Sequence, residues 1–169
     1  DPAVATGDLN AYRLHLADLA LVTMAEAGSG HEALAAAARA LVPPGTPVVS
    51  TVLRPRPAEP VAGRTVAYFC TAPASEHARL AGHLEAVNGA EVVHVSGNLA
   101  DRAALRAELP AVEAEVFVVE LKAAAVDVVA EEAGARGVAV VLAANDVLPL
   151  PGETDLDAEL LRLAEEACS

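Results

Sequence analysis

Polar side chains that could bind a small anion follow four apolar runs of the chain from residue 64 onwards. Each run has the length of a buried strand and ends in a polar segment. In an open parallel sheet, ligands bind beyond the carboxyl ends of the strands, so these side chains are expected to share one edge. They are Thr71 and Ser75 after the first run, Asn98 and Arg102 after the second, Glu120 and Lys122 after the third, and Asn145 and Asp146 after the fourth.

Lys122 is the only lysine of the chain. It lies at a strand end among Ala, Leu and Val residues, where an unpaired ammonium group would be costly. Glu120 lies two residues away and can share its side of an extended segment. Two interpretations stay open: a structural ion pair between Glu120 and Lys122, or a phosphate or carboxylate clamp in which Lys122 supplies the charge.

Three residues of this edge have a structural alternative. Ser75 and Asp101 stand where helices are expected to begin, and their side-chain oxygens can cap the first free amide groups. Arg102 can be a surface cation beside Asp101 or Glu108 instead of a phosphate ligand. The sequence holds no GxGxxG segment, no Walker A loop and no His/Cys pattern with zinc spacing. No metal site is therefore expected, and the catalytic residues stay unassigned.

Charge and composition exclude several classes of partner. The chain has 169 residues and a formal net charge of -13, which repels nucleic acids and anionic membranes. The apolar fraction of 54% is enough for a buried core. No apolar stretch is long enough to cross a membrane, and the first residues do not resemble a signal peptide, so a cytoplasmic location is expected.

Strands and helices are expected to alternate from residue 64 onwards. The strands are predicted at residues 64–71, 91–96, 115–120 and 138–143. The helices are predicted at residues 75–88, 101–109, 123–136 and 156–167. Strands that are apolar throughout indicate a sheet covered on both faces. The pattern predicts an α/β fold, namely a Rossmann-like domain with a mainly parallel sheet of four strands covered by helices.

The first part of the chain has a strand predicted at residues 18–23, a helix at 31–41 and a strand at 46–53. Pro55, Pro57 and Pro60 then follow within seven residues. Such a segment is expected neither to continue a strand nor to start a helix, so it is predicted to be a linker. The predicted domains are residues 1–57 and 58–169.

Several segments resemble the cyclic 2,3-diphosphoglycerate synthetase family. They are residues 9–13 with 17–26, 52–55, 71–73, 96–102 and 120–129. The resemblance extends from about residue 9 to residue 148. It implies that residues 1–57 are the last strands and helix of a P-loop-type α/β domain, and that residues 58–169 are the carboxyl-terminal domain. The P-loop itself is missing from the sequence.

The resemblance implies an ATP- and Mg²⁺-dependent ligase or kinase. The full-length enzyme would phosphorylate 2-phosphoglycerate and then close a phosphoanhydride ring. Because the P-loop is missing and the first residue is not Met, the chain is expected to be the carboxyl-terminal part of a longer enzyme. This piece alone is expected to be inactive and to bind no cofactor. Its expected partners are a small phosphorylated metabolite and the missing P-loop domain, and a homodimer stays open.

The segments that carry the resemblance also supply the candidate site residues. Lys122 and Arg102 are expected to balance phosphate charge, Asn98 to contact a hydroxyl or phosphate oxygen, and Glu120 to orient Lys122. The full set of candidate substrate- or phosphate-binding residues is Arg13, Arg54, Thr71, Asn98, Arg102, Glu120 and Lys122. Thr23 and Glu26 are expected near the nucleotide or metal.

Two other functions stay open at the level of the sequence. The chain could be a non-enzymatic domain that binds a small anion or has a regulatory role. It could also be a structural or dimerisation domain, in which Glu120 and Lys122 form a plain ion pair.

Overall fold

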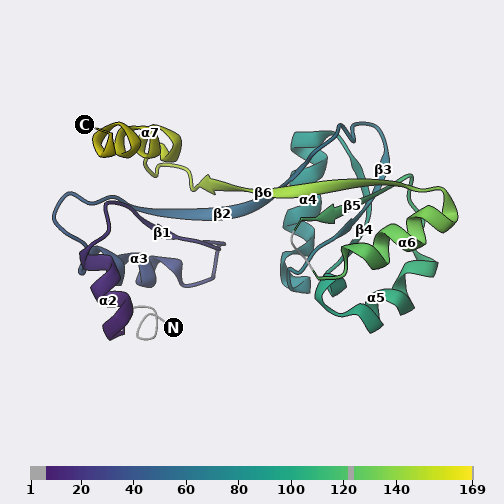
Figure 1. Ribbon diagram of the computed structural model, residues 1–169, viewed down its shortest axis with the longest axis horizontal. Helices are drawn as coiled ribbons and strands as arrows, with labels where there is room; N and C mark the ends of the chain where they lie inside the picture. Colours follow the sequence, from purple (N-terminus) through teal and green to yellow (C-terminus); the bar gives the residue numbers. More distant parts are fainter. Residues whose placement is uncertain (1–6, 122–123, 169) are drawn as a thin grey trace. The chain divides into compact units, whose positions relative to one another are not determined.

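The computed structural model describes residues 7–121 and 124–168 (Figure 1). The chain divides into two compact units. One unit is the chain up to Leu53 together with the residues from Val147 onwards, and the other is Arg54–Asp146. Strands β2 (Val48–Pro57) and β6 (Ala139–Pro149) contribute residues to both units. The domain boundary between residues 57 and 58 stays a prediction.

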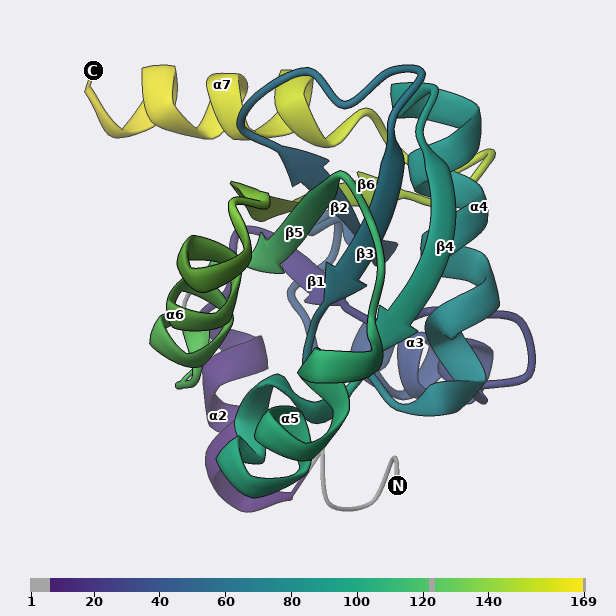
Figure 2. The same ribbon diagram turned by 90° about the vertical axis from the view of Figure 1, so that its right-hand side faces the viewer.

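The second unit contains a parallel sheet with the strand order β4-β3-β5-β6. Its strands are β3 (Thr65–Phe69), β4 (Glu91–Ser96), β5 (Val116–Glu120) and the first part of β6. Each neighbouring pair among these strands is parallel. The crossovers contain α4 (His77–Asn88), α5 (Arg102–Glu108) and α6 (Val126–Arg136). Figure 2 shows α4 on one side of the sheet and α5 with α6 on the other.

Two apolar cores lie on the two faces of this sheet because successive side chains of a strand point to opposite faces. Tyr68 of β3 belongs to a core with Leu84 of α4. Its neighbour Phe69 belongs to a second core with Leu105 of α5 and Val129 of α6. All five side chains are 0–1% exposed. The prediction of a Rossmann-like α/β fold with a mainly parallel sheet covered by helices is therefore confirmed.

The bounds of several elements follow from local sequence. β4 and α7 (Leu156–Ala167) have the predicted bounds. Helix α4 ends at Gly89, whose φ of 66° favours glycine. The expectation that Ser75 caps this helix is wrong: Ser75 lies in a 3₁₀ turn, η1 (Ala74–Glu76), and makes no capping hydrogen bond. Val87, near the end of this helix, is 67% exposed.

The prediction of a linker at the proline-rich segment is wrong, because β2 continues to Pro57. The N–H of Ala58 donates to the Leu142 carbonyl of β6 at 2.8 Å. Since the backbone groups of a strand alternate in direction, Pro55 and Pro57 turn their ring nitrogens away from β6. Strand β1 (Ala20–Val22) pairs with β2 only at residues 48–50, so these prolines interrupt no ladder hydrogen bond.

The first unit is smaller and has a smaller core. It contains α2 (Asp8–His15), β1, α3 (His31–Arg39), the first part of β2 and α7. β1 is parallel to β2, and the core consists mainly of short side chains such as Ala35 and Ala38. Helix α2 was not predicted, and none of its residues is buried. Membership of this unit in a P-loop-type domain stays a prediction.

Candidate functional site

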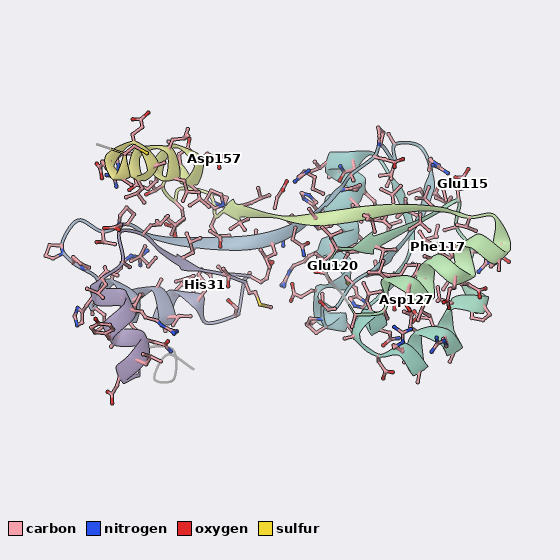
Figure 3. All side chains as sticks on the ribbon, viewed as in Figure 1. His31, Glu115, Phe117, Glu120, Asp127 and Asp157 are labelled. Carbon is pink, nitrogen blue, oxygen red and sulfur yellow. The ribbon has the colours of Figure 1, made fainter. Side chains whose placement is uncertain are left out.

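A cluster of polar side chains surrounds Glu120 at the carboxyl edge of the sheet in the second unit. Glu120 is the last residue of β5, which lies between β3 and β6 (Figure 3). One carboxylate oxygen accepts hydrogen bonds from the backbone N–H and the hydroxyl of Thr71, both at 2.9 Å. The other accepts from the Asn145 amide at 2.6 Å. We call these three residues the Glu120 cluster.

The partners of Glu120 differ from those considered in the sequence. Thr71 follows β3 and Asn145 lies in β6, so the carboxylate joins the two strands on either side of β5. Thr71 and Glu120 were both candidate site residues, and the structure brings them together. Lys122 lies outside the described residues, so its ion pair with Glu120 and its role as a phosphate clamp both stay predictions.

A second cluster surrounds Glu108, the last residue of α5. The Ser96 hydroxyl donates to Oε2 of Glu108 at 2.8 Å, and the Asn98 amide donates to the same oxygen at 2.7 Å. His94 Nε2 lies 2.5 Å from Oε1. We call these four residues the Glu108 cluster. Asn98 was a candidate site residue, whereas sequence reasoning considered Glu108 only as a partner of Arg102 and assigned His94 no role.

The Glu108 carboxylate is stabilised in its charged form. Partial burial by itself would raise its pKa, but the hydrogen bonds from Asn98, Ser96 and His94 outweigh burial and lower the pKa below the ordinary value of 4.5. Glu108 is therefore ionised at neutral pH and can only accept hydrogen bonds. One pattern in the sequence points to this cluster: His94, Ser96 and Asn98 stand at every second position. In an extended backbone, side chains at every second position point to the same side of the strand.

The turn after β4 packs tightly against the segment after β3. A Cβ atom on Gly97 would lie 2.5 Å from the Ala72 carbonyl oxygen and 3.1 Å from His77 Nε2. His77 itself lies within hydrogen-bond distance of the Ala72 carbonyl, at 3.1 Å. The N–H of Leu99 donates to the Cys70 carbonyl at 3.1 Å. Only glycine fits at position 97 without a shift of the neighbouring backbone, and the turn places Asn98 beside the end of β3.

Arg102 is held by residues at the start of α6. Its guanidinium donates to both carboxylate oxygens of Asp127, at 2.8 and 2.6 Å, and to the Ala124 carbonyl at 3.1 Å. The hydrogen bond that Arg102 donates to Asp127 raises the pKa of Arg102, and the same bond lowers the pKa of Asp127. Its carboxylate partner is thus Asp127, not Asp101 or Glu108. Asp101 instead caps α5, as expected, by accepting from the N–H groups of Ala103 and Ala104 at 3.1 Å.

The remaining polar residues of the second unit's edge include two arginines of β2. Arg56 Nε donates to Asp146 at 2.8 Å. His83 of α4 hydrogen-bonds the Pro55 carbonyl, and its pKa is lowered, chiefly by partial burial and then by the nearby charge of Arg54. Arg54, a candidate phosphate ligand, therefore lies near the imidazole of His83. The charge of Arg56 is thus balanced by Asp146, and Arg54 is the cation that acts on His83.

The other candidate residues belong to the first unit. Arg13 is exposed in the last turn of α2, and Thr23 is exposed after β1. Glu26 is half-buried. Between Thr23 and Glu26, Met24 has a φ of 57°, which is uncommon for a residue other than glycine. The roles of these three residues stay predictions.

The side chains described at the carboxyl edge of the second unit's sheet are suited to binding and orienting a ligand. The carboxylates of this edge hold the Asn98 and Asn145 amides by hydrogen bonds at 2.7 and 2.6 Å. Among residues 7–121 and 124–168, no group of three or more His, Cys, Asp or Glu side chains is arranged to hold a metal ion. No helix of this part of the chain is long and apolar enough to cross a membrane.

Comparisons with known proteins connect this fold to one family. Residues 57–146 match the model of the cyclic 2,3-diphosphoglycerate synthetase C-terminal domain. The chain is 46% identical to the cyclic 2,3-diphosphoglycerate synthetase of Rubrobacter xylanophilus over 99% of its own length and 38% of the relative's. It is 41% identical to the protein of that name from Thermococcus gammatolerans, over 92% of this chain and 35% of the relative. The chain thus spans a little over a third of these relatives.

Proposed function

The chain belongs to the cyclic 2,3-diphosphoglycerate synthetase family, and we propose that it is the carboxyl-terminal part of an ATP-dependent enzyme. The whole enzyme would phosphorylate 2-phosphoglycerate and close the phosphoanhydride ring, with ATP and Mg²⁺ bound mainly by the part that this chain lacks. The observation that carries the proposal is the 46% identity over 99% of this chain to a relative of that name. It is supported by the match of residues 57–146 to the C-terminal domain of the family.

Within this enzyme, we propose that the carboxyl edge of the second unit contributes to binding the phosphoglycerate. Thr71 and Asn98 would contact the substrate directly, and Lys122 and Arg54 would balance phosphate charge. Glu120 would fix the position of Thr71 through the hydrogen bonds at 2.9 Å. Phosphoryl transfer depends on positioning and on charge neutralisation, so a rigid edge with nearby cations suits this task.

Arg102 has a different role in this proposal. Its guanidinium already binds Asp127 and the Ala124 carbonyl, so a phosphate would have to compete with these contacts. We assign Arg102 to holding the segment that follows β5. For the first unit, Arg13 stays a proposed phosphate ligand, and Thr23 and Glu26 stay proposed neighbours of the nucleotide or metal.

A chimera tests the proposed function. This chain would replace the matching part of the Rubrobacter xylanophilus relative, and ³¹P NMR would follow a reaction with 2-phosphoglycerate, ATP and Mg²⁺. The proposal predicts ATP-dependent formation of the cyclic phosphoanhydride. Lys122→Ala in the chimera should lower kcat/KM by about tenfold or more, because a charge-assisted hydrogen bond to phosphate is lost.

Arg79→Ala is the matched control, since it also removes one cation. Arg79 pairs with Glu76 on the surface of α4 at 2.9 Å and has no role in the proposed site. Its kinetics should match those of the unsubstituted chimera. Unchanged kinetics in Lys122→Ala would sink the role of this lysine, and a folded chimera without cyclic product would contradict the proposed function.

A further inference from the structure

The Asn98 amide can face Glu108 in only one way. An ionised carboxylate accepts hydrogen bonds and donates none, so the amide nitrogen and not the amide oxygen must lie against it. Nδ2 lies 2.7 Å from Oε2 of Glu108. The amide oxygen Oδ1 is on the other arm of the planar group and therefore faces elsewhere. Among the described residues, the hydrogen bonds of Asn98 use its backbone N–H, its backbone carbonyl and Nδ2, and none of them ends on Oδ1.

Neighbouring contacts fix the position of this amide. The backbone N–H of Asn98 donates to the Ser96 hydroxyl at 3.1 Å, and that hydroxyl donates to Glu108. Ser96 is 2% exposed, so these bonds are shielded from water. Gly97 packs against the Ala72 carbonyl with no room for a side chain. Asn98 is half-buried and is held through both its backbone and its side chain, which is the arrangement expected of a preorganised ligand contact.

We propose that Glu108 is a positioning residue that turns the amide oxygen of Asn98 towards the bound ligand, so that this position accepts a hydrogen bond from a ligand hydroxyl. The inference rests on the proposed function, which places Asn98 in the substrate site. A phosphate oxygen needs a donor and would be poorly served by an amide oxygen. The hydroxyl of 2-phosphoglycerate is the group of that molecule that can donate when its phosphate and carboxylate are ionised. The proposal therefore narrows the role of Asn98 from a hydroxyl or phosphate contact to a hydroxyl contact.

The same arrangement occurs a second time on this sheet edge. Asn145 donates its amide nitrogen to Glu120 at 2.6 Å, which leaves its own amide oxygen on the other arm. Asn145 is exposed and Glu120 is half-buried. Glu108 and Glu120 thus each orient an asparagine amide. The negative charge of the ligand's anionic groups must be balanced by cationic side chains instead. This repetition supports orientation of the amides as the task of both carboxylates.

Binding of a matched ligand pair tests the proposal. Calorimetry on the 169-residue chain would compare 2-phosphoglycerate with 2-phospholactate, which lacks only the hydroxyl. The unsubstituted chain should bind 2-phosphoglycerate about tenfold more tightly, as expected for one buried hydrogen bond. In Glu108→Gln the amide of Asn98 is free to turn over, so this preference should fall to about twofold or less while both ligands still bind. Glu85→Gln, an exposed charge removal on α4, should keep the preference.

The outcomes separate this inference from the proposed function. Equal binding of both ligands by the unsubstituted chain overturns the hydroxyl contact and leaves the proposed function standing. Binding of neither ligand overturns the assignment of a ligand to Asn98 and counts against the proposed function as well. A preference that persists in Glu108→Gln overturns the positioning role of Glu108.

A measurement without ligand tests the orientation by itself. The side-chain NH₂ signals of Asn98 in a ¹⁵N-labelled chain should shift when Glu108 is protonated at acid pH, because the amide then loses its ionised acceptor. The same signals in Glu108→Gln should show no such titration, and Glu85→Gln should behave like the unsubstituted chain. Asn98 signals that do not respond to the state of Glu108 would overturn the proposal even if the chain binds phosphoglycerate.

Discussion

The Glu108 carboxylate contributes to folding through its hydrogen bonds with His94, Ser96 and Asn98. These bonds outweigh partial burial and lower the pKa of Glu108 in the folded chain. A carboxyl group with a lowered folded-state pKa stabilises the protein above its unfolded-state pKa, and this contribution is lost as the pH falls through the folded-state pKa. The relevant window is therefore below about pH 4.5, the ordinary value for Glu.

Glu108→Gln should lower the free energy of unfolding at pH 7 by about 1–3 kcal/mol, because three donors lose an ionised acceptor. The difference from the unsubstituted chain should shrink as the pH falls below about 4.5 and through the lowered pKa of Glu108, where Glu108 itself becomes protonated. Urea denaturation at these pH values measures both effects. Glu85→Gln is the control. A difference that stays constant down to the acid end would contradict the assigned ionisation.

Position 97 gives a second prediction at the scale of single residues. Gly97→Ala should destabilise the chain by about 1–3 kcal/mol, because its Cβ would lie 2.5 Å from a backbone oxygen that cannot move freely. Gly134→Ala in α6 is the matched control. A Cβ there meets nothing within 4 Å, so the variant should be as stable or more stable by up to about 1 kcal/mol. Equal stability of the two variants in urea denaturation would refute the close packing at Gly97.

Sequence reasoning placed Glu120 at the sheet edge but could not find its partners. The predicted partner, Lys122, was chosen because it lies two residues away. The described partners Thr71 and Asn145 are 49 and 25 residues away. Parallel strands are joined by long crossovers, so residues that meet at a sheet edge are distant in sequence. Glu108 was not considered as a partner of Asn98 for another reason: it reaches Ser96 and Asn98 from the last residue of a helix, 12 and 10 residues along the chain.

At the scale of elements, helix capping separates two residues that look alike in sequence. Asp101 accepts hydrogen bonds from two free N–H groups of α5, whereas Ser75 caps no helix. Asp101→Ala should therefore cost about 1 kcal/mol of stability. Ser75→Ala should change stability by less than about 0.5 kcal/mol. Thermal unfolding of both variants measures the difference, and a comparable loss in Ser75→Ala would contradict the described start of the helix.

The elements that sequence predicted best are those whose ends have local signals. α7 begins after the capping residue Asp155 and has the predicted bounds. β2 and β6 are longer than predicted, because strand length there depends on pairing with a neighbouring strand and not on local propensity. The prolines of β2 suggested that the strand ends before them. A proline fits in a strand where its nitrogen faces a side without a partner strand, and the sequence does not reveal which side that is. Helix α2 has no fully buried residue, and only Leu14 packs against the core, so periodicity gave little indication of it.

At the scale of the whole molecule, the two units differ in how much apolar surface they bury. The second unit has a core on each face of its sheet, with Phe69, Phe117 and Tyr68 among its buried side chains. The core of the first unit consists of alanines, valines and a few partly buried side chains. Because burial of large side chains dominates stability, the second unit is expected to open less readily.

Amide hydrogen exchange tests this difference directly. The N–H groups of β3 and β5 should exchange more slowly than those of β1 and α3, by about tenfold or more, because opening the smaller core costs less free energy. Mass spectrometry of peptides from both units would measure the rates under the same conditions. Equal protection in the two units would show that the chain opens as one cooperative unit and would contradict this expectation.

The central claim is that this chain supplies phosphoglycerate-binding groups to an enzyme whose nucleotide site lies mainly in another part. Calorimetric titration of the 169-residue chain with 2-phosphoglycerate and, separately, with ATP and Mg²⁺ tests this claim most directly. We predict saturable binding of 2-phosphoglycerate without ATP, and no binding of ATP by the chain alone. Binding of ATP together with a failure to bind 2-phosphoglycerate, or binding of neither ligand, would contradict the account.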